Sequence, residues 1–229
     1  MPNNITNRLE IKGTDDQLSE VLEAINGEQG IIDFNKIIRM PESLFIDEES
    51  YSMNIQDVLF GNDQLSLKLI LVTQRVLTDM DEQSRKKYVE IALTRQSNQE
   101  KYGHASWYEW SKEHWGTKWN AYNQYLVDGQ DNAIYFETAW ISPYKVIAQL
   151  SKMYPEVEFE VKYVDECPGE YSGIYAYKNG EEVKQIDLRG KEEESYELFF
   201  EIHPNCRKDY RKLKDGTYEW IVEEDDVED

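Results

Sequence analysis

Cysteine is nearly missing from this 229-residue sequence, which contains only Cys167 and Cys206 and no CxxC motif. Two cysteines exclude a disulfide framework and are typical of a protein from a reducing compartment. One disulfide between them stays open, but we expect both thiols to be free and the protein to be cytoplasmic. Glycine and proline are scarce too, at 12 and 6 residues, which excludes collagen-like and low-complexity chains.

Long apolar runs are also missing. The densest run, Leu69 to Val72, is far shorter than the roughly 20 residues that cross a membrane. The first ten residues hold one basic side chain, Arg8, and no apolar stretch, so we expect no export signal. The sequence contains no Walker loop, dinucleotide-binding glycines, nucleophile elbow, HExxH helix or EF-hand loop. We therefore expect no cofactor, no metal and no catalytic residues, and we favour a protein that is not an enzyme.

Positive charge is scarce as well. The sequence has 25 Lys and Arg residues and 46 Asp and Glu residues, which gives a net charge of −21. This balance disfavours nucleic acids and anionic membranes as partners and favours either solubility or a basic partner. Residues 217–229 carry seven carboxylates and no base, and residues 181–201 carry eight carboxylates and three bases. The basic stretch between them, residues 203–215, is expected to pair with these acids.

The residues that are present predict an α+β protein. Positions 5–12 alternate apolar and polar side chains, which indicates a half-buried strand. Thr14 and Gln17 form a capping-box pattern before an amphipathic helix that ends at Asn26-Gly27. Ile31–Met40 is rich in β-branched residues and is followed by Pro41, so it predicts a second strand or an extended segment. Residues from about 50 to 99 have helical periodicity, and an aromatic-rich segment follows to Tyr125.

Strand and helix signals return after that segment. Strands are predicted around residues 134–140, 157–163 and 173–177, with a hairpin turn at Asn179-Gly180. Ser142-Pro143 is expected to open a helix, with Ser142 as the N-cap. Alternation of Tyr196, Leu198, Phe200 and Ile202 predicts a further strand, and residues 214–217 predict a turn before a last one.

This order predicts a ferredoxin-like split βαβ antiparallel sheet with a helical insertion and a C-terminal β extension. We place the ferredoxin-like domain at residues 1–178, its helical insertion at about 50–125, and the acidic extension and tail at 179–229. Two cysteines cannot supply the four thiolates of an iron–sulfur cluster, so the name describes topology only.

Several segments resemble the YubB ferredoxin-like proteins of phages and plasmids. The resemblance covers about residues 1–178 and rests on segments that lie at residues 3–9 (NNITNRL), 32–41 (IDFNKIIRMP), 107–110 (WYEW), 115–122 (WGTKWNAY), 136–140 (FETAW) and 142–143 (SP). It implies a ferredoxin-like fold and an origin in a mobile element, hence a bacterial host cytoplasm. Because the function of that family is uncharacterised, it implies no activity.

Two groups of residues are candidate binding sites. The first is the loop Trp115-Gly-Thr-Lys-Trp-Asn120, in which Lys118 and Asn120 supply a cation and an amide beside Trp115, Trp119 and Tyr122. The alternative is that these tryptophans only fill the space between sheet and insertion. The second group is Glu192, Glu197 and Glu201 on the acidic surface, which is either a solvated face or a rigid array of carboxylates. His203 and Cys206 form one ligand-like pair, which is too few ligands to predict zinc.

The leading functional hypothesis is a non-enzymatic binding protein of a mobile element that occludes a host or defence protein. The partner would be a host or phage protein with a basic or aromatic-accepting surface. One alternative is an acidic mimic of DNA that blocks a nucleic-acid-binding protein. Another is an enzyme acting on a small molecule or nucleotide at the Trp115–Asn120 loop. Oligomeric state and the identity of the partner are left open.

Overall fold

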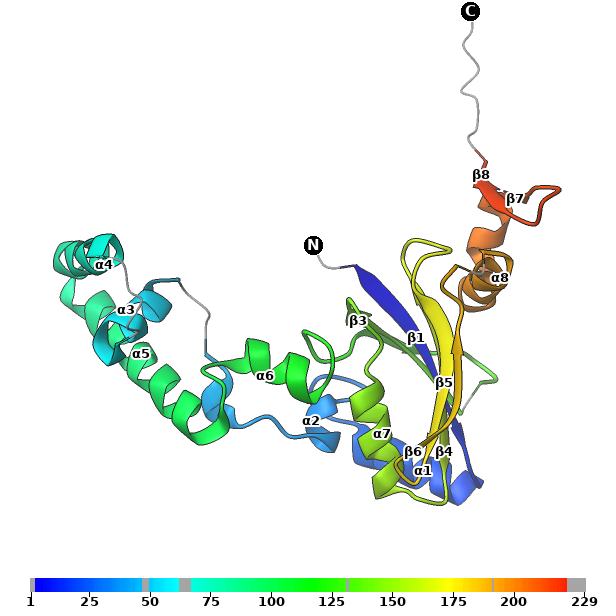
Figure 1. The fold of residues 1–229 in the computed structure, drawn as a ribbon. Helices are drawn as coiled ribbons and strands as arrows, with labels where there is room; N and C mark the ends of the chain where they lie inside the picture. Colours follow the sequence, from blue (N-terminus) through cyan, green and yellow to red (C-terminus); the bar gives the residue numbers. More distant parts are fainter. Residues whose placement is uncertain (1–2, 47–49, 62–66, 131, 191, 222–229) are drawn as a thin grey trace, which may run out of the picture. The chain divides into compact units, whose positions relative to one another are not determined.

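The computed structural model describes residues 3–46, 50–61, 67–130, 132–190 and 192–221 (Figure 1). The chain forms two compact units. The first contains Met1–Arg39 and His114–Asp229, and the second contains Met40–Glu113. Each unit is described by itself.

The first unit is built on one six-stranded sheet in the order β2-β3-β1-β4-β5-β6 (Figure 1). All neighbouring strands pair antiparallel, as expected. The strands are β1 (Asn4–Lys12), β2 (Tyr122–Leu126), β3 (Ala133–Ala139), β4 (Glu158–Asp165), β5 (Ser172–Lys178) and β6 (Glu181–Asp187). The predicted first strand and the turn between β5 and β6 are thus confirmed.

Helices α1 (Asp15–Ile25) and α7 (Tyr144–Met153) bury apolar side chains of their own, and Figure 1 shows α7 on one side of the sheet. Ile5, Leu9 and Ile11 of β1 are at most 2% exposed, because alternate residues of a strand share a face. The predicted capping box is present: the Gln17 N–H donates to the Thr14 hydroxyl, and the Thr14 N–H donates to the Gln17 side chain. Local sequence therefore sets where α1 begins.

The opposite side of the sheet is covered in part by α8 (Glu192–Ile202), followed by a 3-10 helix (Pro204–Asp209) and the hairpin of β7 (Tyr210–Lys212) and β8 (Tyr218–Trp220). The hairpin was expected, but the strand predicted at residues 196–202 is wrong. Ser195, Leu198, Phe199 and Ile202 are all buried and share one helical face. Leu198, Phe199 and Ile202 form a second core with Tyr135, Val164, Leu188 and Tyr218.

Three further local predictions are corrected. Ile31–Met40 contains no strand but a short helix, α2 (Phe34–Ile37), because the Asp33 side chain caps the N–H of Asn35. Tyr122–Leu126, expected partly within the helical insertion, forms the edge strand β2. Ser142 does not cap α7: the N-cap position is Pro143, and the Ser142 hydroxyl bonds to Tyr175 instead.

The described part of the second unit after residue 50 consists mainly of helices, as its periodicity predicts. The unit contains a short 3-10 helix (Glu42–Leu44), α3 (Ser50–Phe60), α4 (Leu67–Asp79), α5 (Glu82–Tyr102) and nearly all of α6 (Trp107–His114). Asn98 joins two of these segments, because its amide donates to the carbonyl of Ser43 at 2.7 Å. Across the described ranges, the helices are all too short or too polar to span a bilayer.

Candidate functional site

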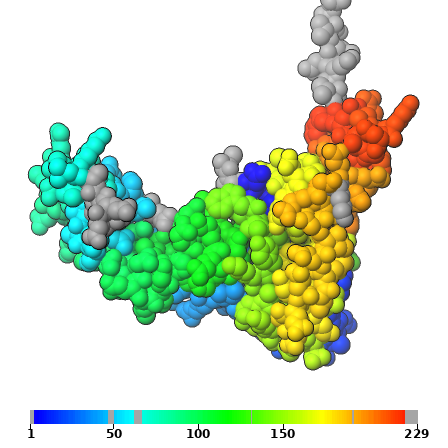
Figure 2. Space-filling view, in the orientation of Figure 1, coloured from blue at the N-terminus to red at the C-terminus, as the bar shows by residue number. Residues whose placement is uncertain are grey.

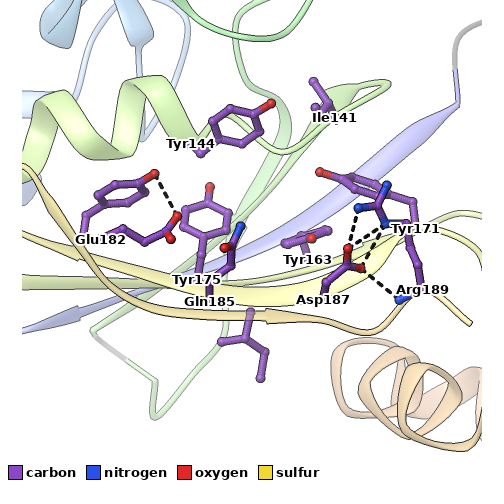
Figure 3. A pocket seen from close by; sticks show the side chains of 11 residues that line it. Ile141, Tyr144, Tyr163, Tyr171, Tyr175, Glu182, Gln185, Asp187 and Arg189 are labelled. Carbon is purple, nitrogen blue, oxygen red and sulfur yellow. Dashed lines mark hydrogen bonds and ion pairs between the residues drawn. The ribbon is translucent and has the colours of Figure 1, made fainter. Parts of the chain in front are cut away.

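Five tyrosines surround a cavity of about 410 Å³ on the α7 side of the sheet (Figure 3). Tyr144 comes from the first turn of α7, Tyr163 from β4, Tyr171 from the loop after β4, and Tyr175 and Tyr177 from β5. The rest of the lining consists of Ile141, Ile174, Glu182, Gln185, Asp187 and Arg189. We call this cavity the tyrosine pocket.

Strand register brings most of these rings together. Tyr175 is paired with Val161 and Tyr163 with Gly173, so Tyr163 and Tyr175 project on the same face of neighbouring strands. Gly173 leaves room for the phenol of Tyr163, since a Cβ there would lie 2.7 Å from the hydroxyl oxygen of that tyrosine. The ring centroids of Tyr163 and Tyr175 are 5.9 Å apart, and those of Tyr163 and Tyr171 are 4.7 Å apart.

Charged groups stand at both ends of the pocket. At one end the Asp187 carboxylate accepts a hydrogen bond from Nε of Arg189 at 2.9 Å, and the Arg189 guanidinium lies 6.0 Å from the ring centroid of Tyr171. At the other end the Tyr177 hydroxyl donates to the Glu182 carboxylate at 3.3 Å. Figure 3 shows Gln185 between these ends. The rim therefore carries two carboxylates and one cation.

Burial favours the protonated form of four of the phenols, those of Tyr163, Tyr171, Tyr175 and Tyr177. Desolvation raises the pKa of Tyr171 and Tyr175 far above the ordinary value, and it also raises the pKa of Tyr163 and Tyr177. The neighbouring carboxylates Asp187 and Glu182 add to the shifts of Tyr163 and Tyr177, respectively. At neutral pH these groups can donate or accept hydrogen bonds, but none is a phenolate that could act as a base.

Neutral aromatic rings beside carboxylates form a chemical environment that suits a cation. The faces of aromatic rings attract ammonium and guanidinium groups, at about 0.5–2 kcal/mol for each contact. The Arg189 guanidinium, between a carboxylate and a tyrosine ring, already shows this combination of contacts in the pocket itself. The arrangement can therefore bind a positively charged group.

A second hollow, of about 630 Å³, lies between α8 and strands β5 and β6. Its apolar side chains belong to Ile174, Ile186, Leu188 and Leu198, and its acidic ones to Glu193, Glu194, Glu197 and Glu201. We call it the glutamate groove. Two of the carboxylates predicted as binding residues, Glu197 and Glu201, line it, whereas Glu192 does not.

Lysines already neutralise part of this acidic surface. Glu193 accepts a hydrogen bond from Lys212 at 2.6 Å, Glu197 lies 3.9 Å from the same ammonium, and Glu201 is paired with Lys162. The Tyr218 hydroxyl also donates to Glu197. The expected pairing of the basic stretch with the acidic segments is confirmed at Lys212. The carboxylates after Ile221 lie outside the described residues.

The Trp115–Asn120 loop serves largely in packing. Trp115 is 3% exposed and donates its indole N–H to the carbonyl of Ile38 at 2.9 Å. The Asn120 side chain accepts from the N–H of Phe34 at 2.9 Å and donates to Asp33 at 2.7 Å. These bonds hold the start of α2, so the structural alternative describes Trp115 and Asn120 better than a binding role does.

Among the other predicted loop residues, Trp119 is exposed, whereas Lys118 and Tyr122 are half-buried. The Lys118 ammonium lies 4.3 Å from the ring centroid of Trp119, which is 38% exposed, and 5.2 Å from that of Trp140. The Tyr122 hydroxyl donates to the Asn4 side chain at 2.6 Å, and burial raises its pKa to about 12. None of the predicted loop residues lines the tyrosine pocket.

No group of three or more His, Cys, Asp and Glu side chains suited to a metal ion occurs among residues 3–46, 50–61, 67–130, 132–190 and 192–221. His203 instead packs on Phe199, with ring centroids 4.8 Å apart, and burial lowers its pKa. Cys167 and Cys206 are both free thiols.

The sequence interpretation missed the tyrosine pocket. Tyr163, Tyr175 and Tyr177 do have the spacing of residues that share one face of a strand, and this signal was available. This spacing does not show that β4 and β5 are neighbours in the sheet. It also does not show that Tyr144, from a helix, and Tyr171, from a loop, lie beside them.

Comparison with a protein-family model supports the fold. Residues 114–204, less than half of the chain, match the family model described as the ferredoxin-like domain in Api92-like protein. The expected ferredoxin-like class is confirmed at this level; the YubB name and the origin in a phage or plasmid stay predictions.

The crystal structure of protein api92 from Yersinia pseudotuberculosis aligns with 82% of this chain and 98% of its own, at 12% identity and a TM-score of 0.42. No curated protein matches the sequence.

Proposed function

We propose that this chain is a non-enzymatic binding protein that holds a basic side chain of a partner protein in the tyrosine pocket. The observation that carries the proposal is the convergence of five tyrosine rings on a cavity whose rim bears the Glu182 and Asp187 carboxylates. Lining of this kind favours a cation that is partly removed from water, because ring faces and carboxylates both attract it. An arginine or a lysine supplies such a cation on a protein surface.

Arginine fits this pocket better than lysine does. A guanidinium is planar, so it can stack on a tyrosine ring while it donates two hydrogen bonds to one carboxylate. Arg189 makes this pair of contacts at one end of the pocket, with Tyr171 and Asp187. The other end has the same two groups, a tyrosine ring and a carboxylate, in Tyr177 and Glu182. We therefore assign the Tyr177 end to the guanidinium of the partner.

The wider role that we propose is occlusion of a host or defence protein by a protein of a mobile genetic element. Its support is the resemblance of several segments to phage and plasmid proteins, together with the net charge of −21. A negative surface accelerates encounter with a basic partner and repels acidic ones. We also propose that β1, α1, β2, β3, α7 and β4 together make one split βαβ unit. In the sequence, the helical segment is inserted between α1 and β2 of this unit.

The two alternatives receive less support. A DNA mimic needs unpaired carboxylates at fixed spacing, but Lys212 and Lys162 occupy Glu193 and Glu201. An enzyme that uses the Trp115–Asn120 loop needs free polar groups there, but Asn120 is bonded to Phe34 and Asp33. Neither observation applies to the tyrosine pocket.

The test is a titration with N-acetyl-argininamide, followed by NMR of tyrosine ring signals. N-acetyl-citrullinamide is the matched neutral control, since it has nearly the same shape and no charge. We expect weak binding of the arginine derivative, with a dissociation constant on the order of millimolar, and at least tenfold weaker binding of the citrulline derivative.

Two variants locate the site. Glu182→Gln and Tyr177→Leu should each weaken binding about three- to tenfold, because each removes one of the two contacts. Glu181→Gln, next to Glu182 but outside the pocket lining, and Tyr125→Leu, on another strand, are the matched controls. Equal affinity for both ligands, or equal effects of the variants and their controls, would contradict the proposal.

A further inference from the structure

Strand β6 is an edge of the six-stranded sheet, with β5 on one side and no strand among the described residues on the other. The tyrosine pocket and the glutamate groove lie on opposite faces of this strand. Gln185 and Asp187 line the tyrosine pocket, and Ile186 and Leu188 line the glutamate groove. Figure 2 shows the yellow-to-orange surface of β5 and β6 facing the viewer.

The register shows which backbone groups of β6 point to the open edge. Leu188 donates its N–H to the carbonyl of Ser172, which makes these two residues a hydrogen-bonded pair. Hydrogen-bonded and non-hydrogen-bonded pairs alternate along an antiparallel ladder. Gln185, opposite Tyr175, and Asp187, opposite Gly173, are therefore non-hydrogen-bonded pairs. Their N–H and C=O groups point away from β5.

We propose that an extended basic segment of the partner protein adds to β6 as a seventh, antiparallel strand. This inference rests on the proposed function and adds the conformation of the partner segment to it. Backbone hydrogen bonds to Gln185 supply affinity, and side chains that alternate between the two faces supply specificity. All described pairings of this sheet are antiparallel, which favours the same direction for the added strand.

The two faces select different side chains. Directly opposite residues of an antiparallel pair share a face, so the residue opposite Gln185 enters the tyrosine pocket, where we place arginine. Its neighbours on either side turn toward the glutamate groove, where Ile186 and Leu198 offer apolar contact. The partner segment thus alternates arginine with an apolar residue.

Charge selects a partner segment over a second copy of this chain. Strand β6 carries Glu181, Glu182 and Asp187 against a single base, Lys184. Two copies of β6 paired at their open edges would bring carboxylates together, whereas an arginine-bearing strand complements them. Both faces beside β6 also carry carboxylates, Glu182 in the pocket and Glu193 in the groove.

The test uses a capped heptapeptide that alternates arginine and valine, and two N-methylated forms of it. In antiparallel addition the arginines that face the pocket direct their N–H groups toward β6, and the valines direct theirs away. Methylation of the arginine nitrogens should therefore weaken binding at least tenfold. Methylation of the valine nitrogens should change it less than threefold. Equal binding of both methylated peptides, or a preference for the N-methylarginine form, overturns the inference.

Protein variants test the same edge. Gln185→Pro removes an N–H that points outward and leaves the bonds between β5 and β6 in place, because proline is tolerated there on an edge strand. We expect it to lose at least tenfold in heptapeptide affinity. Gln185→Ala removes the side chain and keeps the N–H, so it should lose less than threefold. Thermal unfolding of both variants verifies that they are folded.

The outcomes separate the two proposals. If N-acetyl-argininamide binds and the effects of the methylated peptides are equal, strand addition is wrong and the pocket assignment stands. If N-acetyl-argininamide does not bind while the heptapeptide shows the predicted methylation pattern, the edge is the binding site and the pocket assignment is wrong.

Discussion

The hydroxyl groups of Ser142 and Tyr175 lie 2.9 Å apart, and the two side chains are 0% and 4% exposed. Ser142 lies two residues before α7, and Tyr175 belongs to β5. Their hydrogen bond therefore joins the start of the helix to the wall of the tyrosine pocket. A buried hydroxyl that loses its partner costs about 1–3 kcal/mol, so this bond contributes to both the stability of the unit and the shape of the pocket.

We expect Ser142→Ala and Tyr175→Phe each to lower the free energy of unfolding by about 1–2 kcal/mol. The double variant should lose less than the sum of the two, since either change already breaks the bond. Urea denaturation of the four proteins measures this coupling. Additive losses would mean that the two hydroxyls do not interact in solution.

Asn120 provides a test of the structural interpretation of the aromatic loop. Asn120→Ala should lower the free energy of unfolding by about 1–3 kcal/mol, because it leaves the N–H of Phe34 and the side chain of Asp33 without this partner. Binding of N-acetyl-argininamide should stay within twofold of wild type. Trp119→Ala is the control on the exposed side of the loop, with an expected loss of about 0.5 kcal/mol. If Asn120→Ala weakened binding strongly without lowering stability, the aromatic loop would again be the better candidate for the binding site.

From the contacts of Glu160 we predict that the stability of the protein depends on pH. Glu160 is 7% exposed, and its carboxylate lies 2.8 Å from Lys184 and 3.0 Å from Lys12. Burial alone would raise its pKa, but the two ammonium groups outweigh burial and hold the pKa below the usual 4.5. A group with a lowered pKa stabilises the fold above its unfolded-state pKa, and this contribution is lost as the pH falls through its folded-state pKa.

Glu160→Gln should therefore destabilise the protein by about 1–2 kcal/mol at pH 7 and by much less at pH 3. Urea denaturation of variant and wild type at both pH values gives the two differences. Comparing differences removes the general effect of titrating the other carboxylates. An equal loss at both pH values would show that Glu160 acts through packing and not through its charge.

From the carboxylates of the glutamate groove we predict that the association rate of the arginine–valine heptapeptide depends on salt concentration. Neutralising Glu193 and Glu194 to glutamine should slow association and flatten its dependence on salt, because charges beyond a Debye length of about 10 Å at 0.1 M are largely screened. Glu20→Gln with Glu23→Gln, on α1, makes the same change in net charge and is the control. Stopped-flow association rates between about 0.05 M and 0.5 M salt compare the two pairs. Equal effects would mean that only total charge matters.

Local signals were sufficient where a short segment determines its own structure. The capping box at Thr14, the alternation of β1 and the turn at Asn179-Gly180 all depend on neighbouring residues, and all three are confirmed. The helix α8 was missed because Tyr196, Leu198, Phe200 and Ile202 fit period 2. Phe199 and Ser195, together with three glutamates in the first turn, fit a helix better, since acidic residues stabilise a helix N-terminus.

The binding site was harder to predict, because it depends on contacts between distant segments. Trp115 and Lys118 were chosen for their unusual local composition, and local composition does not distinguish a packed indole from an exposed one. The tyrosine pocket joins Tyr144 to residues of β4, β5 and the β6 region, and this needs the sheet order. The glutamates of α8 were identified as acidic, but their lysine partners come from β4 and β7.

The most direct test of the guanidinium site is a filtered NOE experiment on the complex with N-acetyl-argininamide. Binding in the tyrosine pocket predicts contacts between the δ-methylene protons of the ligand and the rings of Tyr177 and Tyr144, and loss of these contacts in Glu182→Gln. Contacts confined to the indoles of Trp119 and Trp140, with none to the pocket tyrosines, would contradict the account and place the cation at the aromatic loop.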